Sequence, residues 1–381
     1  MTHSLTVVAQ KPADLSRRLL LVGAAGLAAC GLRKSRGFRG YALVANAGGR
    51  TVAAVDLEAF VLARQIGMEA APGAIVPHPR RPAAYVLIPE TGTVCEIDAL
   101  KLDVVRKRRL GAPALTMLLS PDKQSLWVLR QRALVRLETN HLRIAQVIPL
   151  PGAASSFDLG ADARAAVTFP ADGRLALVRL DTGTVEHLVD TGAGPSLVRF
   201  RGDGKQVLAG TADHSLTIFD TASGQVVVRL PMPVEPAHAC FDTAGGQMFV
   251  TGPGMDVVVI VYPFQTEVGE TILAGRAPAG MAVSGSFGYL FVANPQSDSI
   301  TVLDIDTRKL VAAVAVGQEP RQILITPDNQ YALVLNWRSG NMAVIRNAAF
   351  TARRYRTNPA PLFTMVPVGL QPAAAAVVAV P

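Results

Sequence analysis

The feature that most constrains this chain is an internal repeat, marked by prolines that recur at a nearly constant spacing. They are Pro72, Pro113, Pro195, Pro236, Pro278 and Pro320. The gap between Pro113 and Pro195 equals two periods, and Ala154 occupies the position between them. The next member is Pro372, and residues 348–361 account for the extra length as an insertion. Such a period predicts tandem units that each pack against their neighbours.

Each period contains four short runs with the properties of β-strands. Residues 321–326 and 331–335 are apolar runs, and the intervening residues 327–330 (Pro-Asp-Asn-Gln) have the composition of a tight turn. In the preceding unit, residues 300–304 and 310–316 form two further runs joined by a hairpin. No helical period is present, so we predict an all-β chain made of four-stranded antiparallel meanders.

Sheets of this size bury both faces only by packing against neighbours around an axis, which is the arrangement of a β-propeller. Second strands are expected to begin near Tyr41, Tyr85, Leu126, Ala166, Val207, Met248, Tyr289 and Tyr331. The count predicts eight blades, and a seven-bladed ring with one terminal unit packed outside is the alternative. Residues 373–380 should complete the blade begun by residues 41–66, so that the C-terminal strand closes the ring.

Several strands resemble the repeats of YVTN-type propellers. Residues 289–294 (Tyr-Leu-Phe-Val-Ala-Asn), 299–304 (Ser-Ile-Thr-Val-Leu-Asp) and 316–320 (Val-Gly-Gln-Glu-Pro) match the family's strands and corner, and residues 41–46 are a second copy. The resemblance covers residues 41–381. It implies a propeller of the cytochrome cd1 and quinoprotein-like superfamily, and because the repeat motifs are structural it implies neither a catalytic set nor a cofactor.

The positive charge of the chain is concentrated at its N-terminus. Residues 1–40 carry seven basic groups and one acidic group, out of 37 basic and 29 acidic groups in all. The rest therefore has 37 − 7 = 30 basic and 29 − 1 = 28 acidic groups, a net charge of +2. This balance does not demand a basic face on the propeller, so we expect no nucleic-acid partner.

The N-terminus has the pattern of an export signal. Residues 19–32 carry no charge, and this stretch is too short to span a bilayer but suits the apolar segment of a signal peptide. Arg17 and Arg18 in front of it resemble a twin-arginine signal, and an ordinary secretory signal is the alternative.

The end of this segment, Leu27-Ala28-Ala29-Cys30, resembles the lipobox of bacterial lipoproteins. The resemblance implies lipidation of Cys30, with an ordinary cleavage site beside a chance cysteine as the alternative. Gly31 follows where an aspartate would favour inner-membrane retention, so an outer-membrane anchor facing the periplasm is expected. The predicted organisation is a signal peptide at 1–29, a lipidated cysteine and basic tether at 30–40, and the propeller at 41–381.

Candidate binding residues follow from the expected ring. Ligands of propellers usually lie at the central funnel, on the face formed by the loops between second and third strands and by the interblade connections. Trp and Arg are over-represented at binding hot spots. The candidate binding face therefore comprises Trp337, Arg338, Arg321, His214 and His238.

Each candidate also has a structural interpretation. His214 follows Asp213 and could be a base with its orienting carboxylate, although neighbours on a loop need not touch. His238 and Cys240 share a strand face and are interpreted as a packed core pair, and Cys95 is expected to be another small buried residue. Asn46, Asn294 and Asn336 recur at one repeat position, which favours hydrogen bonds that hold a turn over a ligand-binding ring.

The sequence contains no nucleophile elbow, phosphate loop, zinc motif or haem-attachment motif. We therefore expect no metal site and no catalytic residues, and no cofactor is implied by a motif. The predicted function is a monomeric, non-catalytic envelope module that binds a protein, peptide or glycan. The alternatives are a lactonase-like or quinoprotein-like enzyme with its site in the central funnel, and an assembly scaffold of an envelope complex.

Overall fold

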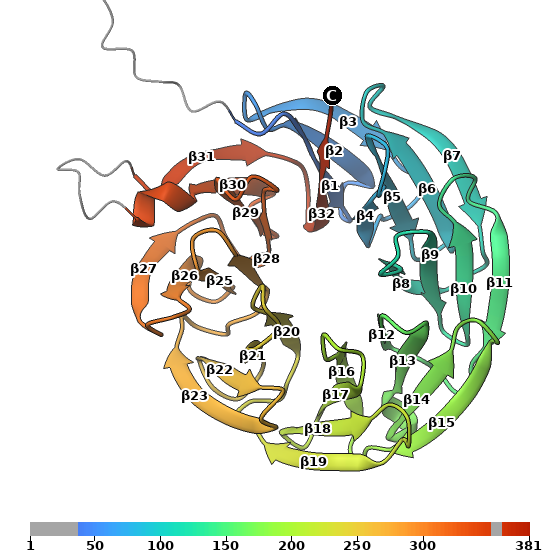
Figure 1. The fold of residues 1–381 in the computed structure, drawn as a ribbon. Coiled ribbons are helices and arrows are strands. Elements are labelled where there is room, and N and C mark those ends of the chain that lie inside the picture. The colour runs from blue at the N-terminus through green and yellow to red at the C-terminus, as the bar shows by residue number, and fades with distance from the viewer. Residues whose placement is uncertain (1–36, 352–359) are drawn as a thin grey trace, which may run out of the picture. The chain divides into compact units, whose positions relative to one another are not determined.

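The computed structural model describes residues 37–351 and 360–381. Within these residues, 32 strands form eight four-stranded antiparallel sheets, with two short 3-10 helices, η1 (Pro170–Asp172) and η2 (Asn347–Phe350). The propeller residues form a ring of eight blades (Figure 1), which confirms the predicted fold and blade count. Cys30, Arg17 and Arg18 lie outside the described residues.

We label the blades A to H in chain order, beginning with the blade of the first strand. The strands of each blade are given from the innermost outward. Blade A consists of β32 (Pro372–Ala379), β1 (Gly40–Asn46), β2 (Thr51–Asp56) and β3 (Val61–Gly67), and blade B of β4 (Ile75–Pro77), β5 (Ala83–Ile88), β6 (Thr93–Asp98) and β7 (Asp103–Arg109). Blade C consists of β8 (Ala114–Leu119), β9 (Ser125–Arg130), β10 (Ala133–Glu138) and β11 (Ile144–Pro149), and blade D of β12 (Ser156–Leu159), β13 (Arg164–Phe169), β14 (Arg174–Arg179) and β15 (Thr184–Asp190).

Blades E to H follow the same plan. Blade E consists of β16 (Pro195–Phe200), β17 (Gln206–Thr211), β18 (Ser215–Asp220) and β19 (Val226–Pro231), and blade F of β20 (His238–Phe241), β21 (Met248–Thr251), β22 (Val257–Tyr262) and β23 (Glu267–Leu273). Blade G consists of β24 (Met281–Ser284), β25 (Tyr289–Asn294), β26 (Ser299–Asp304) and β27 (Leu310–Ala315), and blade H of β28 (Pro320–Ile325), β29 (Tyr331–Asn336), β30 (Asn341–Arg346) and β31 (Leu362–Pro367).

The core lies between neighbouring blades. Every residue of β5 and β29 is buried, whereas the outermost strands β3 and β7 are mostly exposed. One apolar cluster joins blade A to blade H through Val44, Leu57 and Leu333. Because each middle strand has a neighbouring blade on both sides, its apolar residues do not need to alternate with polar ones.

The C-terminal strand closes the ring as predicted. β32 pairs antiparallel with β1, with Tyr41 opposite Val378 and Ala45 opposite Ala374, so strands from the two ends of the described chain share blade A. Ala375, Ala376 and Val378 are buried. Small side chains suit this innermost position because the blades converge there.

A polar cluster around a buried carboxylate links blades B and C. Glu96 is 1% exposed and forms ion pairs with Arg81 (Nη2–Oε1 2.9 Å) and Arg106 (Nη1–Oε2 3.2 Å). The hydroxyl of Tyr85 and the guanidinium of Arg106 donate hydrogen bonds to the backbone carbonyls of residues 139 and 140 in blade C. The cluster therefore connects two blades through polar contacts as well as apolar packing.

His78 belongs to the same cluster and gives the stability of the fold a pH dependence. Its Nδ1 accepts hydrogen bonds from the backbone amides of Arg80 and Arg81, both 3.1 Å long. Burial, reinforced by the charge of Arg81, lowers the pKa of His78 to about 4. Between that value and about 6.5, the unfolded chain binds a proton at this position that the folded chain does not.

We therefore expect His78 to contribute stability above pH 6.5 that is lost as the pH falls towards 4. The slope should reach about 1.4 kcal/mol per pH unit at most, since each pKa unit corresponds to that free energy. Urea unfolding of wild type and His78→Asn at pH 7.0, 5.5 and 4.5 measures it. The variant should show a flatter dependence, and identical slopes in both proteins would contradict the assignment.

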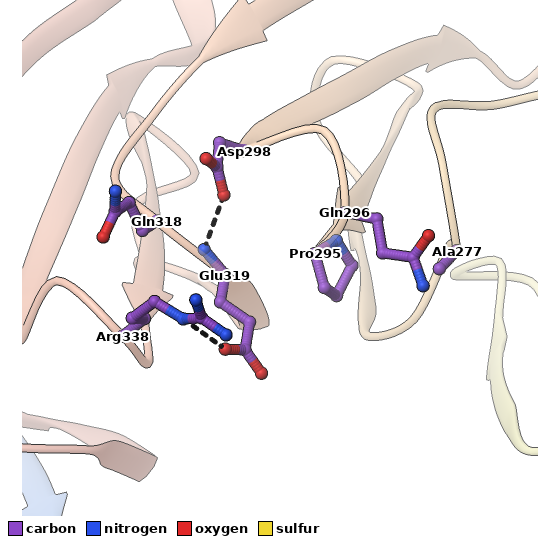
Figure 2. A pocket seen from close by; sticks show the side chains of 7 residues that line it. All are labelled: Ala277, Pro295, Gln296, Asp298, Gln318, Glu319 and Arg338. Carbon is purple, nitrogen blue, oxygen red and sulfur yellow. Dashed lines mark hydrogen bonds and ion pairs between the residues drawn. The ribbon is translucent and has the colours of Figure 1, made fainter.

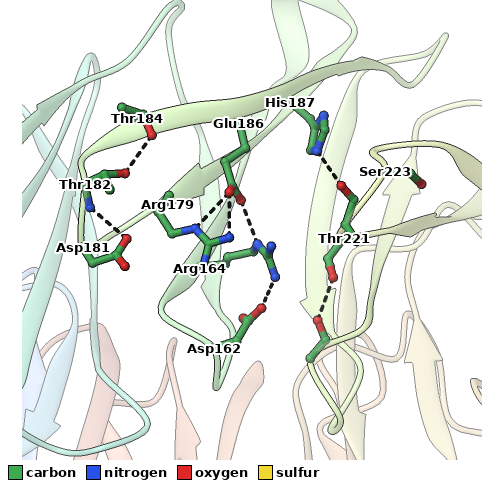
Figure 3. Close-up of polar contacts among 12 residues, drawn as sticks. Asp162, Arg164, Arg179, Asp181, Thr182, Thr184, Glu186, His187, Thr221 and Ser223 are labelled. Carbon is green, nitrogen blue, oxygen red and sulfur yellow. Dashed lines mark hydrogen bonds and ion pairs between the residues drawn. The ribbon is translucent and has the colours of Figure 1, made fainter.

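Blade D carries a second polar network, on its outer strands. Glu186 accepts hydrogen bonds from Arg164 (Nε–Oε2 2.8 Å) and Arg179 (Nη2–Oε1 2.7 Å), and Arg164 also pairs with Asp162 (Figure 3). Partial burial alone would raise the pKa of the Glu186 carboxyl, but the two arginines outweigh it and lower that pKa. The network joins the second, third and fourth strands of one blade and is therefore structural.

The ring has two different faces. The upper face carries the loops between second and third strands and the connections from one blade to the next. The lower face carries the remaining turns, and the described chain begins there. Gly37 lies so close to the β2–β3 turn on this face that an added Cβ would be 1.9 Å from the carbonyl oxygen of Leu57. Within the described residues, no helix is long and apolar enough to cross a membrane.

Candidate functional site

Two adjoining pockets lie on the upper face over blades F, G and H. Their volumes are about 610 and 490 Å³, and both are lined by Ala277 and Gln296. We call the two together the F–H trough. Its other lining residues are Pro295, Asp298, Gln318, Glu319, Arg338, His238, Gly252, Pro253, Gly254, Met255, Asp256, Pro278 and Ala279.

The shape of the trough is fixed by side chains in the loops between second and third strands. These side chains accept hydrogen bonds from the connection that leads to the next blade. Asp256 Oδ1 accepts a hydrogen bond from the amide of Ala277, and Asp298 Oδ1 accepts one from the amide of Glu319, both 2.8 Å long. Both receiving residues have positive φ, 54° and 56°. The two carboxylates thus hold strained corners of the backbone, which gives the trough a defined shape.

One end of the trough holds a charged cluster (Figure 2). Glu319 is paired with Arg338, whose Nε lies 3.3 Å from Oε2. It is also paired with Arg321, which is not drawn in the figure. Partial burial alone would raise the pKa of the Glu319 carboxyl, but hydrogen bonds and charge from Arg321, then Arg338, lower it below its usual value. The Glu319 side chain is 17% exposed, against 49% and 70% for Arg321 and Arg338, so both arginines remain accessible to a ligand.

Trp337 completes this cluster. The guanidinium carbon of Arg321 lies 4.1 Å from the centre of a Trp337 ring, a cation–π arrangement. The structure therefore brings three of the five sequence-predicted residues together: Arg321 from the innermost strand β28, and Trp337 and Arg338 from the β29–β30 loop.

His238 and Cys240 do not form the packed core pair predicted from the sequence. They lie on the innermost strand β20, where His238 is exposed and lines the 490 Å³ pocket, while Cys240 is half-buried. Protein surrounds the imidazole on several sides, and this desolvation, with the charge of Arg199, lowers the pKa of His238. Burial raises the pKa of the Cys240 thiol to about 12, so the thiol stays protonated at neutral pH. Cys95, by contrast, is buried as predicted.

His214 is an exposed loop residue near the edge of the trough. A Cβ added at Gly254 would lie 3.2 Å from its Cε1 atom. The neighbouring Asp213 does not act as its orienting carboxylate, because Asp213 Oδ1 accepts hydrogen bonds from Thr211 (2.6 Å) and Ser215 (2.8 Å). These bonds lower the pKa of Asp213 and assign it to the turn.

The three recurrent asparagines are completely buried. Asn46 donates to the carbonyl of Val368, in the connection from blade H, and Asn294 accepts from the amide of Gly275, in the connection from blade F. Their structural role is confirmed, but at these two positions the bonds reach the preceding interblade connection as well as the asparagine's own turn.

Sequence reasoning missed the parts of the trough that depend on small polar side chains. Gln296, Asp256 and Asp298 belong to loops of unremarkable composition. A signal was present nonetheless, since Asp256, Asp298 and Ser339 each follow a second strand by a few residues and each bonds to an interblade amide. Among residues 37–351 and 360–381, no group of three or more His, Cys, Asp or Glu residues could hold a metal ion.

Comparisons with known proteins also identify β-propellers, although both sequence matches are described as seven-bladed and the described residues of this chain form eight blades. A family model described as "Lactonase, 7-bladed beta-propeller" matches residues 238–353, which include blades F and G and the first three strands of blade H. The seven-bladed beta-propeller protein Rv1057 of Mycobacterium tuberculosis is 24% identical over 136 residues, and the match covers 35% of each chain. The aligned region is thus about a third of the curated relative's length.

Two solved structures are similar over most of this chain. Dihydro-heme d1 dehydrogenase NirN, in complex with DHE, superposes with a TM-score of 0.74 and 16% identity over 88% of this chain and 75% of that chain. Kuenenia stuttgartiensis hydrazine synthase gives a TM-score of 0.58 and 18% identity over 72% of this chain and 95% of that chain. At these identities the likeness concerns the fold.

Proposed function

We propose that this protein is an exported, membrane-tethered binding module whose F–H trough holds a polar peptide segment of a partner protein. The observation that carries this proposal is the charged cluster at the end of the trough. There, Glu319 holds two accessible arginines, Arg321 and Arg338, beside Trp337. Glu319 and Arg338 line the pocket of about 610 Å³. Pre-positioned arginine and tryptophan side chains are the residue types that dominate binding energies.

The trough suits a peptide because it offers both donors and acceptors at a fixed spacing. Gln296 provides an amide between the two pockets, and its side chain lies between Pro295 and Ala277 in Figure 2. Charges of both signs line the same surface, at Asp298, Glu319 and Arg338. A peptide backbone with mixed side chains can pair with such a surface, whereas one ring of Trp337 is already covered by Arg321 and is less available for stacking on a glycan.

Peptide selection tests this proposal. Peptides enriched on the wild-type protein from a random display library should bind at least tenfold more weakly to Arg338→Glu, a loss of about 1.4 kcal/mol or more. Lys123→Glu, which reverses an exposed charge in a lower-face turn, is the matched control and should change affinity less than twofold. Failure to enrich any peptide, or equal losses in both variants, would refute it. A glycan array probed with the same variants tests the glycan alternative.

The tether is the second part of the proposal. If Cys30 is lipidated, intact-mass and peptide mass spectrometry of protein from a native host should find a diacylglyceryl cysteine at the mature N-terminus. Cys30→Ala should move the protein from the membrane fraction to the soluble fraction. An unmodified N-terminus downstream of residue 30 would contradict the assignment. The tether would join the propeller at its lower face, where the described chain begins.

The second candidate function is a propeller enzyme. It is favoured by the lactonase family match over blades F–H and by the likeness to NirN, whose structure contains the bound compound DHE. His238, exposed in the 490 Å³ pocket, is the side chain through which such chemistry could act. Lactone hydrolysis by the purified protein, or saturable binding of a haem that His238→Ala abolishes, would establish this candidate over the peptide-binding one.

A further inference from the structure

The upper loop of blade C is shorter than its counterparts. Only Gln131 and Arg132 separate β9 from β10, whereas four residues separate β5 from β6 and β25 from β26. The shortened loop borders a pocket of about 250 Å³. Its lining residues are Ala112, Pro113, Arg130, Gln131, Arg132 and Ala133.

The guanidinium of Arg130 is held in place by the connection from blade B. A Cβ added at Gly111 would lie 3.1 Å from Arg130 Nη2 and 3.4 Å from Cζ, so the group packs against the glycine. Gly111 has a φ of 90°, a backbone conformation that favours glycine. The Nε atom of Arg130 is buried and has no hydrogen-bond partner in the described structure. This arginine is therefore fixed in position while part of its hydrogen-bonding capacity is unused.

Blade E offers an internal comparison. There, Arg229 packs in the same way against Gly192, at 3.2 Å from Nη2 to an added Cβ. Both terminal nitrogens of Arg229 have partners: Nη2 donates to the carbonyl of Thr191 (2.7 Å) and Nη1 pairs with Asp213 (3.5 Å). Among residues 37–351 and 360–381, no ion pair includes Arg130 or Arg132.

We propose that the blade C pocket is an oxyanion-binding site in which Arg130 and Arg132 together take one carboxylate or phosphate group. The two arginines place two positive charges around a pocket that no acidic side chain lines. The planar arginine fork matches the oxygen pairs of carboxylate and phosphate, and such charge-assisted bonds are among the stronger polar contacts. The external anion supplies what Asp213 supplies to Arg229.

This site is distinct from the F–H trough, because the two share no lining residue. The anion could be a free phosphate or carboxylate, or an acidic side chain of a macromolecule. The chemistry that recognises it is the same in both cases. The two sources predict different affinities: a site for an acidic macromolecule should bind a chain of several linked carboxylates more tightly than a single anion, whereas a site for a free anion should not.

Isothermal titration at low ionic strength, with inorganic phosphate and with pentaglutamate as probes, tests the proposal. The Arg130→Gln/Arg132→Gln variant should bind either probe at least tenfold more weakly than wild type. Arg50→Gln, which removes an exposed charge from the same face at blade A, is the matched control and should change affinity less than twofold. If the double variant melts at a lower temperature, Arg132→Gln alone provides the test, since Arg132 is exposed in a loop.

Tighter binding of pentaglutamate than of phosphate, by tenfold or more, would support an acidic segment of a macromolecule as the occupant. Equal or tighter binding of phosphate would support a free anion. Wild-type protein that binds neither probe, or an Arg50→Gln variant as weak as the double variant, would overturn the proposal.

Discussion

Deleting residues 371–381 is expected to yield a protein that aggregates, or that melts far below the full-length chain. The deletion removes β32, which supplies the innermost strand of blade A and pairs with all of β1. It leaves Leu43 and Val44 on an unpaired apolar edge, a template for aggregation. It also uncovers the neighbouring apolar clusters, in which Ala375, Ala376 and Val378 are buried. Burial of one large apolar side chain is worth roughly 1.5–3 kcal/mol, and a whole strand far more.

Thermal unfolding with light scattering measures this effect. Deletion of Pro381 alone is the control, because this residue is exposed and lies beyond the end of β32 at Ala379, so its loss should matter little. A soluble 371–381 deletion with an unchanged melting temperature would show that the ring does not depend on this strand for closure.

Replacing Glu96 by alanine should lower the free energy of unfolding by about 2–3 kcal/mol, because it leaves Arg81 and Arg106 without their shared carboxylate at the junction of blades B and C. The loss should be smaller than for a fully buried pair, since these arginines are 42% and 36% exposed. It should still exceed that of a surface pair, because the Glu96 carboxylate itself is 1% exposed.

Glu270→Ala is the matched control for this experiment. Glu270 pairs with Arg308, but its side chain is 56% exposed, and surface pairs contribute at most about 1 kcal/mol. Urea unfolding of both variants measures the difference. Equal losses in the two variants would show that Glu96 does not stabilise the junction. A loss for Glu96→Ala below about 0.5 kcal/mol, the scale of an ordinary surface substitution, would show the same.

The sequence predicted the architecture because a propeller repeats one unit. Three features recur along the chain: the proline spacing, tight turns such as residues 327–330, and the apolar second strands. A copy with a weak pattern could therefore be assigned from the copies on either side of it. The pairing of the C-terminal segment with β1 followed from the strand count and the small side chains of this segment, and it is confirmed for β32, which ends at Ala379. The clustering of Arg321, Trp337 and Arg338 followed because the repeat assigned them to one face of one blade.

The features that the sequence did not predict depend on single loops rather than on the repeat. His238 was interpreted as half of a packed core pair because it shares a strand face with Cys240, but an innermost strand has one exposed side. The role of Asp298 depends on an amide in the following connection, 21 residues away, which no local pattern reveals. The arginine pair of blade C becomes apparent only when the shortness of its loop is seen beside Gly111.

The most direct test of the proposed function is hydrogen–deuterium exchange of the wild-type protein with and without its selected peptide. Binding in the F–H trough should slow exchange in the loops at residues 252–256, 295–298 and 337–340, and in the connections at 274–280 and 316–319. Exchange in the lower-face turns and in blades B to D should not change. Protection confined to the outermost strands or the lower face, with these loops unaffected, would contradict the trough as the binding site.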